Sequence, residues 1–114
     1  MRITVLAGGV GGARFLRGLR AAGDHEIAAV VNTGDDAWVA GLRITPDLDS
    51  IMYLLAGVND AERGWGRAGE TERVSAELSA WGVGWPWFTL GDLDLGAHIA
   101  RTSWLREGVP LSEA

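Results

Sequence analysis

The 114-residue sequence contains no cysteine, which excludes a disulfide framework and any metal site built from thiolates. It also lacks an uninterrupted apolar run of about 18 residues, so no membrane-spanning helix is predicted. The chain does not open with a basic flank and a long apolar stretch, which argues against a signal peptide. Together these absences favour a cytoplasmic protein.

A surplus of basic residues is missing as well. The formal net charge is −5 at pH 7, which argues against a nucleic-acid-binding protein, because such proteins meet phosphates with basic patches. A single nucleotide remains a compatible ligand, since main-chain N–H groups, one or two arginines and a metal ion can hold its phosphates. Repeats and low-complexity segments are absent, and the length fits one domain at most.

Glycine and tryptophan, in contrast, are abundant, with 17 and 6 residues. Glycine permits backbone conformations and close ligand approaches that side chains forbid. Tryptophan faces can stack on a planar ring, but aromatic side chains dominate core burial. We therefore expect most of the tryptophans in the core.

The first residues predict a phosphate-binding turn. A short strand over Arg2–Leu6 runs into the glycine-dense segment Gly8–Gly12, and a helix is expected over Ala13–Ala22. This order places main-chain N–H groups at a helix N-terminus, where the helix dipole also favours an anion. Arg14 can add a charge-assisted contact. The segment matches neither the dinucleotide fingerprint nor the P-loop, and a tight turn without a ligand is the alternative.

The rest of the chain alternates between predicted strands and helices. The apolar run Glu26–Asn32 is typical of a parallel strand covered on both faces, and a loop follows over Thr33–Ile44. The other expected elements are a helix from Pro46 to Gly57, a loop over Val58–Gly69, a helix over Glu70–Trp81, a short strand over Trp85–Leu90 and a helix from Asp92 to Gly108. The predicted fold class is α/β, a Rossmann-like three-layer parallel sheet with flanking helices, truncated because two or three strands make an incomplete sheet.

Periodicity predicts which helix faces are buried. In the helix that begins after the capping residue Thr45, the expected buried side chains are Leu48, Ile51, Met52 and Leu55. In the last helix, which Asp92 is expected to cap, they are Leu95, Ile99, Thr102 and Leu105.

Several acidic residues offer candidate ligands or bases. Asp35 and Asp36 follow the second strand, and ligands bind at the carboxyl ends of parallel strands. This pair could hold Mg²⁺ or ribose hydroxyls, and solvated carboxylates are the alternative. Asp47 complements the dipole of a first helical turn without any ligand. Asp49 is expected at the edge of the apolar face, within reach of a cleft. His98 is expected to be a hydrogen-bonding partner rather than a catalyst.

Six segments of the chain taken in order carry a resemblance to a known family. They are Gly8–Leu16, Val31–Asp36, Pro46–Ser50, Arg63–Gly66, Trp87–Asp92 and Ala97–Arg101. This set resembles the 2-phospho-L-lactate transferase family (CofD), in particular its actinobacterial phosphoenolpyruvate transferase form. Because family members are much longer, the resemblance implies that residues 1–114 are the N-terminal part of a single nucleotide-binding domain.

The resemblance implies a step in the biosynthesis of coenzyme F-420. The family moves a phosphoenolpyruvyl or 2-phospholactyl group from a GDP-activated donor to the terminal ribityl hydroxyl of the deazaflavin Fo, and it releases GMP with the help of Mg²⁺. A homodimer is implied for the full-length protein. The residues do not settle the donor, although Val10 with Gly12–Arg14 favours phosphoenolpyruvate.

The resemblance also implies site residues. Asp49 matches the family's Fo-contacting aspartate and is the expected catalytic base, because the acceptor hydroxyl must lose a proton. Thr89 lies at a second position that lines the Fo site, although some relatives carry a basic residue there. Trp38 or Trp65 could stack on the fused ring, with core burial as the alternative. The expected substrate-binding residues are Gly8, Gly9, Gly11, Gly12, Arg14, Asp36, Asp49 and Thr89, and the expected metal ligands are Asp35 and Asp36.

Three other interpretations stay open. A nucleotide-sugar-binding regulatory protein would share the glycine turn and the Asp pair but would not need Asp49. A nicotinamide-dependent oxidoreductase would carry an acidic residue at the end of the second strand, where this chain has Asn32. The third is an inactive fragment.

Overall fold

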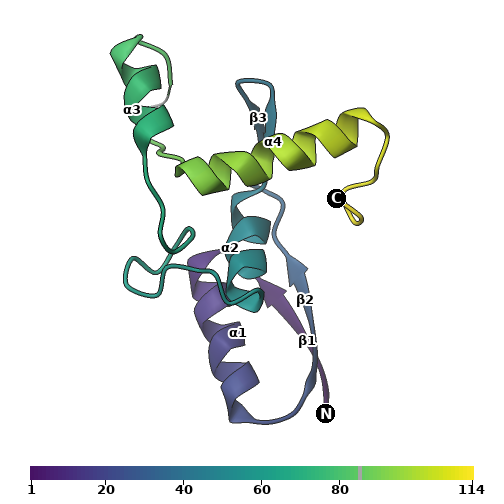
Figure 1. Ribbon diagram of the computed structural model, residues 1–114. Coiled ribbons are helices and arrows are strands. Elements are labelled where there is room, and N and C mark those ends of the chain that lie inside the picture. Colours follow the sequence, from purple (N-terminus) through teal and green to yellow (C-terminus); the bar gives the residue numbers. More distant parts are fainter. Residues whose placement is uncertain (85) are drawn as a thin grey trace. The chain divides into compact units, whose positions relative to one another are not determined.

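The computed structural model describes residues 1–84 and 86–114, which divide into two compact units (Figure 1). Unit 1 comprises Met1–Ala37 and Thr45–Ala68, and unit 2 comprises Trp38–Ile44 and Gly69–Ala114. In chain order the elements are β1 (Arg2–Ala7), α1 (Val10–Ala22), β2 (Glu26–Val31), β3 (Ala37–Val39), β4 (Leu42–Ile44), α2 (Pro46–Leu55), α3 (Arg73–Ala80) and α4 (Asp92–Arg106). None of the described helices combines the length and apolarity of a membrane-spanning segment.

Unit 1 is built on a parallel pair of strands with two helices. β1 and β2 run side by side in a register that pairs Arg2 with Glu26 and Ala7 with Val31. Side chains alternate along a strand, so one face of the pair presents apolar side chains to α1 and α2. The core there comprises Ala7, Ala13, Leu16, Ile51 and Leu54, with Val5, Ile27, Ala29 and Val31 packed against it. The predicted α/β class with parallel strands and flanking helices is confirmed.

The opposite face of the same strands is open. Leu6 is 83% exposed and Val30 is 56% exposed, and polar side chains such as Thr4 share this face. α1 and α2 contact each other as well as the strands, which places both helices on one face. The expectation that β2 would be covered on both faces is therefore wrong for the described residues.

The buried face of α2 differs from the predicted one. Ile51 and Leu54 are buried, whereas Met52 and Leu55 are exposed. Both the predicted and the observed stripes fit helical spacing, and packing on the strands selects the stripe that contains Ile51 and Leu54. α2 begins after Thr45 as predicted, but the Thr45 hydroxyl makes no capping hydrogen bond.

α1 begins earlier than predicted, at Val10 instead of Ala13. Gly11 and Gly12 therefore lie in the first helical turn and not in a loop. A Cβ on Gly12 would lie 3.0 Å from the Cβ of Ala7, so a glycine at this position lets the helix approach β1 closely.

In unit 2, α4 packs on the β3–β4 hairpin through polar contacts. Arg43 N–H donates to Thr102 Oγ1 (2.9 Å), and Arg101 Nη1 donates to the Arg43 carbonyl (3.2 Å). His98, Arg101 and Thr102 are buried, whereas Ile99 is 50% exposed. Of the predicted inner face of α4, Thr102 is confirmed, Leu95 and Leu105 are half-buried, and Ile99 is wrong. The fully buried side chains are polar because the helix packs against backbone groups of the hairpin that require polar partners.

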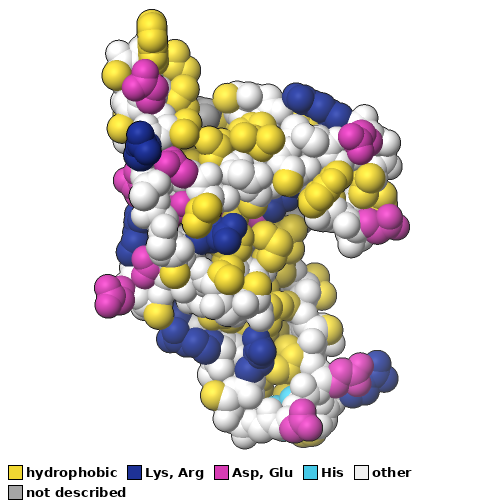
Figure 2. All heavy atoms as spheres, viewed as in Figure 1, with side chains coloured by type: hydrophobic (Ala, Val, Ile, Leu, Met, Phe, Trp, Pro, Cys, Tyr) yellow, Lys and Arg dark blue, Asp and Glu magenta, His cyan; other side chains and the backbone are white. Residues whose placement is uncertain are grey.

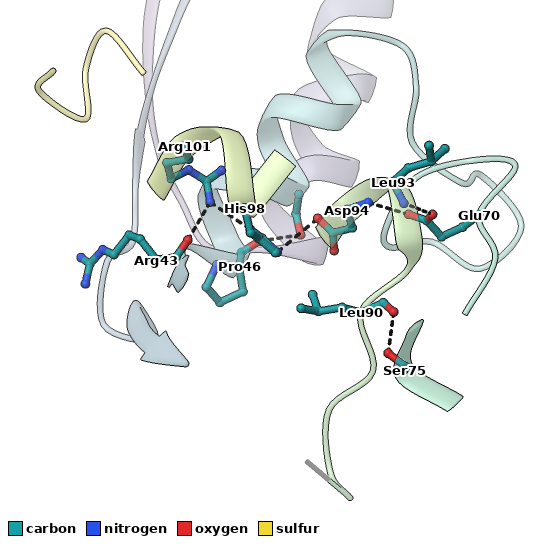
Figure 3. Close-up of polar contacts among 10 residues, drawn as sticks. Arg43, Pro46, Glu70, Ser75, Leu90, Leu93, Asp94, His98 and Arg101 are labelled. Carbon is teal, nitrogen blue, oxygen red and sulfur yellow. Dashed lines mark hydrogen bonds and ion pairs between the residues drawn. The ribbon is translucent and has the colours of Figure 1, made fainter. Parts of the chain in front are cut away.

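The helix starts of α3 and α4 exchange capping side chains. Glu70 accepts hydrogen bonds from the N–H groups of Leu93 (2.6 Å) and Asp94 (3.0 Å) at the start of α4 (Figure 3). Asp92 in turn accepts one from Val74 N–H (3.1 Å) in the first turn of α3. The prediction that Asp92 caps its own helix is therefore wrong, since Glu70 satisfies those amides.

The predicted strand over Trp85–Leu90 is not formed within 86–90, and residue 85 lies outside the described residues. Pro86 has no N–H to donate to a strand partner. The expectation of buried tryptophans is wrong for the five that the structure describes, because Trp38, Trp65, Trp81, Trp87 and Trp104 are all exposed. Apolar side chains lie on the surface over α3 (Figure 2).

Candidate functional site

The first turn of α1 offers main-chain donors. The first helical hydrogen bond runs from Ala13 N–H to the Gly9 carbonyl (2.9 Å), so the amides of 10–12 precede the helical ladder. Within the described chain these three amides have no hydrogen-bond partner. A Cβ on Gly11 would meet nothing within 4 Å, so a ligand can reach this backbone. The arrangement fits an anion, which the helix dipole also attracts.

Asp47 lies against this turn, a placement that the sequence did not predict. A Cβ on Gly9 would lie 2.7 Å from Asp47 Oδ1. The other carboxylate oxygen accepts a hydrogen bond from Asn32 Nδ2 (2.9 Å), and Gly34 N–H donates to Asn32 Oδ1 (3.1 Å). The end of β2, the start of α1 and the first turn of α2 thus meet around one carboxylate. Asp47 lies four and seven residues before the buried Ile51 and Leu54, so it shares their helix face. This spacing could have revealed the direction of its side chain.

Asp49 lies on another side of α2. Two residues advance a helix by about 200°, so Asp49 points away from the direction of Asp47. Asp49 is nevertheless buried, 4% exposed. The role of Asp49 as the catalytic base stays a prediction.

Asp35 and Asp36 follow β2 in a tight turn, in which Asp36 N–H donates to the Thr33 carbonyl (3.1 Å). Asp35 is exposed, whereas Asp36 is half-buried and its Oδ1 atom is shielded from solvent. In the described residues neither belongs to a group of three acidic or histidine side chains whose ligand atoms lie within 4.8 Å of one another. Mg²⁺ does not require such a group, because it takes one or two carboxylates together with phosphate oxygens of a substrate.

Arg14 does not point at the glycine turn. A Cβ on Gly64 would lie 2.8 Å from Arg14 Nη2, so the guanidinium contacts the 58–68 segment. It lines a small cavity there, together with Arg17 and Trp65. Arg63 stacks on the Trp65 ring with its guanidinium carbon 3.9 Å from the ring centroid.

Unit 2 contains the other predicted residue, Thr89, which is exposed and lines a small cavity with Ser75, Ser79 and Phe88. A contact of Thr89 with Fo stays a prediction.

A polar array on α4 was not predicted as a unit. Arg101 Nη1 donates to His98 Nδ1 (3.1 Å), and His98 Nε2 lies 3.4 Å from Asp94 Oδ1 (Figure 3). Because Nδ1 accepts from a guanidinium, the ring proton lies on Nε2, facing the Asp94 carboxylate. Spacings of three and four residues align these side chains, so this signal was present in the sequence. The array confirms that His98 is a hydrogen-bonding partner.

Sequence comparison adds independent findings. The profile of the family described as "2-phospho-L-lactate transferase CofD" matches residues 3–114. The phosphoenolpyruvate transferase of Streptomyces avermitilis is 58% identical over 113 residues, which cover 98% of this chain and 35% of that protein. The same-named protein of Nocardia farcinica is 58% identical over 112 residues, covering 97% and 34%, and that of Mycobacterium avium is 48% identical over 133 aligned residues, covering 99% and 40%.

The chain therefore spans little more than a third of the length of these curated relatives. The family match covers nearly every residue, including the glycine turn and all the predicted site positions. The chain belongs to the 2-phospho-L-lactate transferase CofD family.

Proposed function

We propose that the protein carrying this chain is a transferase of coenzyme F-420 biosynthesis. It moves a phosphoenolpyruvyl phosphate, or a 2-phospholactyl phosphate, from a GDP-activated donor to the deazaflavin Fo and releases GMP. The observation that carries the proposal is the set of partnerless amides at 10–12 in a chain of the CofD family. The names of the relatives favour the phosphoenolpyruvyl donor.

In this proposal the amides of 10–12, with Gly8 and Gly9 shaping the approach, bind the donor diphosphate. Negative charge on the phosphate oxygens is stabilised by donors that already point at it. The Fo hydroxyl oxygen forms the new bond to phosphorus, and its proton passes to the Asp49 carboxylate. The bond from phosphorus to the GMP oxygen breaks, and GMP leaves with that electron pair.

We also assign Asp35 and Asp36 as the ligands of a Mg²⁺ ion. Their place after β2 and the shielded Oδ1 of Asp36 fit an ion shared with substrate phosphates. When bound, such an ion would neutralise part of the diphosphate charge. Thr89 and an exposed tryptophan, Trp38 or Trp65, are the proposed contacts of Fo, and the full-length protein is proposed to be a cytoplasmic homodimer.

Ligand binding to the 114-residue chain tests the donor part of the proposal. We expect GMP to shift the NMR amide signals of 10–12 saturably, and Fo to bind with a fluorescence change. NADH should do neither. Asp49→Asn should weaken Fo binding and leave GMP binding unchanged. An NADH response at these amides, with no response to Fo or GMP, would overturn the transferase proposal in favour of an oxidoreductase.

A further inference from the structure

A cavity beside α1 lies apart from the amides at the start of that helix. Its walls come from α1, α2 and the 58–68 segment, all within unit 1. The side chains that line it include Arg14, Arg17, Ser50, Asn59 and Trp65. Its volume is about 30 Å³, room for about one or two water molecules. Such a space excludes a guanine or a deazaflavin ring and takes only the oxygens of a small head group.

Two uncompensated cations face this cavity. Arg14 and Arg17 are three residues apart and so share one face of α1. Neither guanidinium has a hydrogen bond or ion pair within the described part of the chain. Other arginines of unit 1 are engaged, since Arg2 pairs with Glu26 (3.0 Å) and Arg20 donates to the Leu55 carbonyl (3.2 Å).

The 58–68 segment is shaped to hold the Arg14 guanidinium at the cavity. Gly64 has a φ of +78°, a left-handed conformation that favours glycine. The absence of a side chain there lets Arg14 Nη2 contact the backbone. Trp65 forms a wall on which Arg63 stacks, and Asn59 is a further polar residue of the lining.

Among the described residues, no acidic side chain lines the cavity. Two acidic residues, Asp60 and Glu62, belong to the adjacent turn, and neither lines the cavity. Asp60 accepts hydrogen bonds from the N–H groups of Glu62 and Arg63, both at 2.9 Å. The Asp60 carboxylate therefore forms hydrogen bonds within its own turn. The Ser50 hydroxyl donates to the Pro46 carbonyl (3.0 Å). The cavity is thus locally cationic in a chain whose net charge is −5.

We propose that this cavity binds a small oxyanion, the phosphate or carboxylate head group of a ligand, through Arg14 and Arg17. The planar guanidinium fork matches two oxygens of such a group. The site is separate from the amides of 10–12 and does not depend on the transferase proposal. A free phosphate and the acidic end of a larger substrate present the same chemistry to it.

Titration of the 114-residue chain with inorganic phosphate, and separately with phosphoenolpyruvate, tests the proposal by NMR. We expect saturable shifts at the Nε–Hε signals of Arg14 and Arg17 and at the amides of 64–66. Arg14→Gln or Arg17→Gln should weaken binding about tenfold or more, the usual effect of losing a charged hydrogen bond. Arg14→Lys, which keeps the charge but loses the fork, should weaken it less.

Arg2→Gln is the matched control, because it removes an arginine of the same unit outside the cavity, and it should leave the affinity unchanged. Similar affinity for both probes would show that the site recognises the phosphate group. Tighter binding of phosphoenolpyruvate that is lost in Arg14→Gln and Arg17→Gln would show that the site recognises the carboxylate as well. Both results support the site. The proposal would be overturned if sodium chloride reproduced the NMR shifts. It would also be overturned if the shifts were confined to the amides of 10–12 and were unchanged in folded Arg14→Gln and Arg17→Gln chains.

Discussion

Asp47 places a negative charge where the glycine turn would receive a phosphate. Its carboxylate is held by Asn32 and lies against Gly9. A carboxylate there benefits from the positive end of the α1 dipole, but it also repels a second anion. The same side chain can therefore stabilise the empty turn and weaken phosphate binding when no cation lies between the two.

Asp47→Asn is expected to strengthen GMP binding at the turn about fivefold in metal-free buffer, because removing a like charge near a helix N-terminus is worth about 1 kcal/mol. NMR titration of the amides of 10–12 measures the affinity. Asp24→Asn, a surface carboxylate in the same unit, should change nothing. Weaker binding in Asp47→Asn would show that the carboxylate assists the ligand.

Ala40 is strained in the turn of the β3–β4 hairpin. Its φ is +48°, and Gly41 follows at +76°, so both positions are left-handed, as in a type I′ turn. Asparagine tolerates this conformation better than alanine. Ala40→Asn should therefore raise the free energy of unfolding by about 1 kcal/mol, measured by urea denaturation. Gly41→Ala should lower it, and a destabilised Ala40→Asn chain would refute the assigned geometry.

At the scale of elements, the two faces of the β1–β2 pair should respond differently to truncation. Leu16 of α1 is fully buried against one face, and Leu6 lies on the other, 83% exposed. Leu16→Ala is expected to cost about 2–5 kcal/mol of unfolding free energy, and Leu6→Ala less than about 0.5 kcal/mol. Denaturant unfolding measures both. A comparable loss in both variants would show that the second face is covered.

Asp92 couples α4 to the start of α3. The hydrogen bond from Thr71 Oγ1 (2.7 Å), then that from Val74 N–H, hold the pKa of Asp92 below its ordinary value of 3.8. Because the pKa is lower in the folded state, the ionised carboxylate stabilises unit 2 above about pH 4. That contribution is lost as the pH falls through the folded-state pKa.

Hydrogen exchange of the α3 amides at about pH 7 and about pH 3 measures this effect. In the unmodified chain, the protection of the α3 amides should fall on acidification. In Asp92→Asn this protection should already be lower at neutral pH, and it should fall by a smaller amount on acidification. Glu113→Gln is a control outside both helix starts. Equal acid sensitivity of Asp92→Asn and the unmodified chain would exclude Asp92 as the cause.

For the whole molecule, the sequence predicted the helices and strands better than the contacts between segments that are distant in sequence. The strand–glycine–helix opening and the proline start of α2 are local signals, and they were correct within a few residues. The direction of Asp47, the contact of Arg14 with Gly64 and the exchange of caps between Glu70 and Asp92 depend on segments distant in sequence. Tertiary packing chose among side-chain stripes that periodicity alone left equivalent.

The same limit applies to the candidate site. The glycine turn between β1 and α1 could be located because its signal is contiguous, and its binding of phosphate stays a prediction. His98 was correctly expected to form hydrogen bonds. The arginine cavity was missed because Arg14 was assigned to the glycine turn, whereas its guanidinium contacts Gly64, and Arg17 carries no sequence signal of its own. The 58–68 segment that completes it carries no helical or strand period.

The central claim, transfer to Fo, is tested most directly in a chimera. The matching segment of the Streptomyces avermitilis relative, which covers 113 aligned residues, is replaced by this chain, and GMP release is measured with Fo and the guanylylated phosphoenolpyruvate or phospholactate donor. We predict Fo-dependent turnover, abolished by Asp49→Asn and retained in Asp24→Asn. A folded chimera inactive with both donors while its parent is active, or full turnover in Asp49→Asn, would contradict the account.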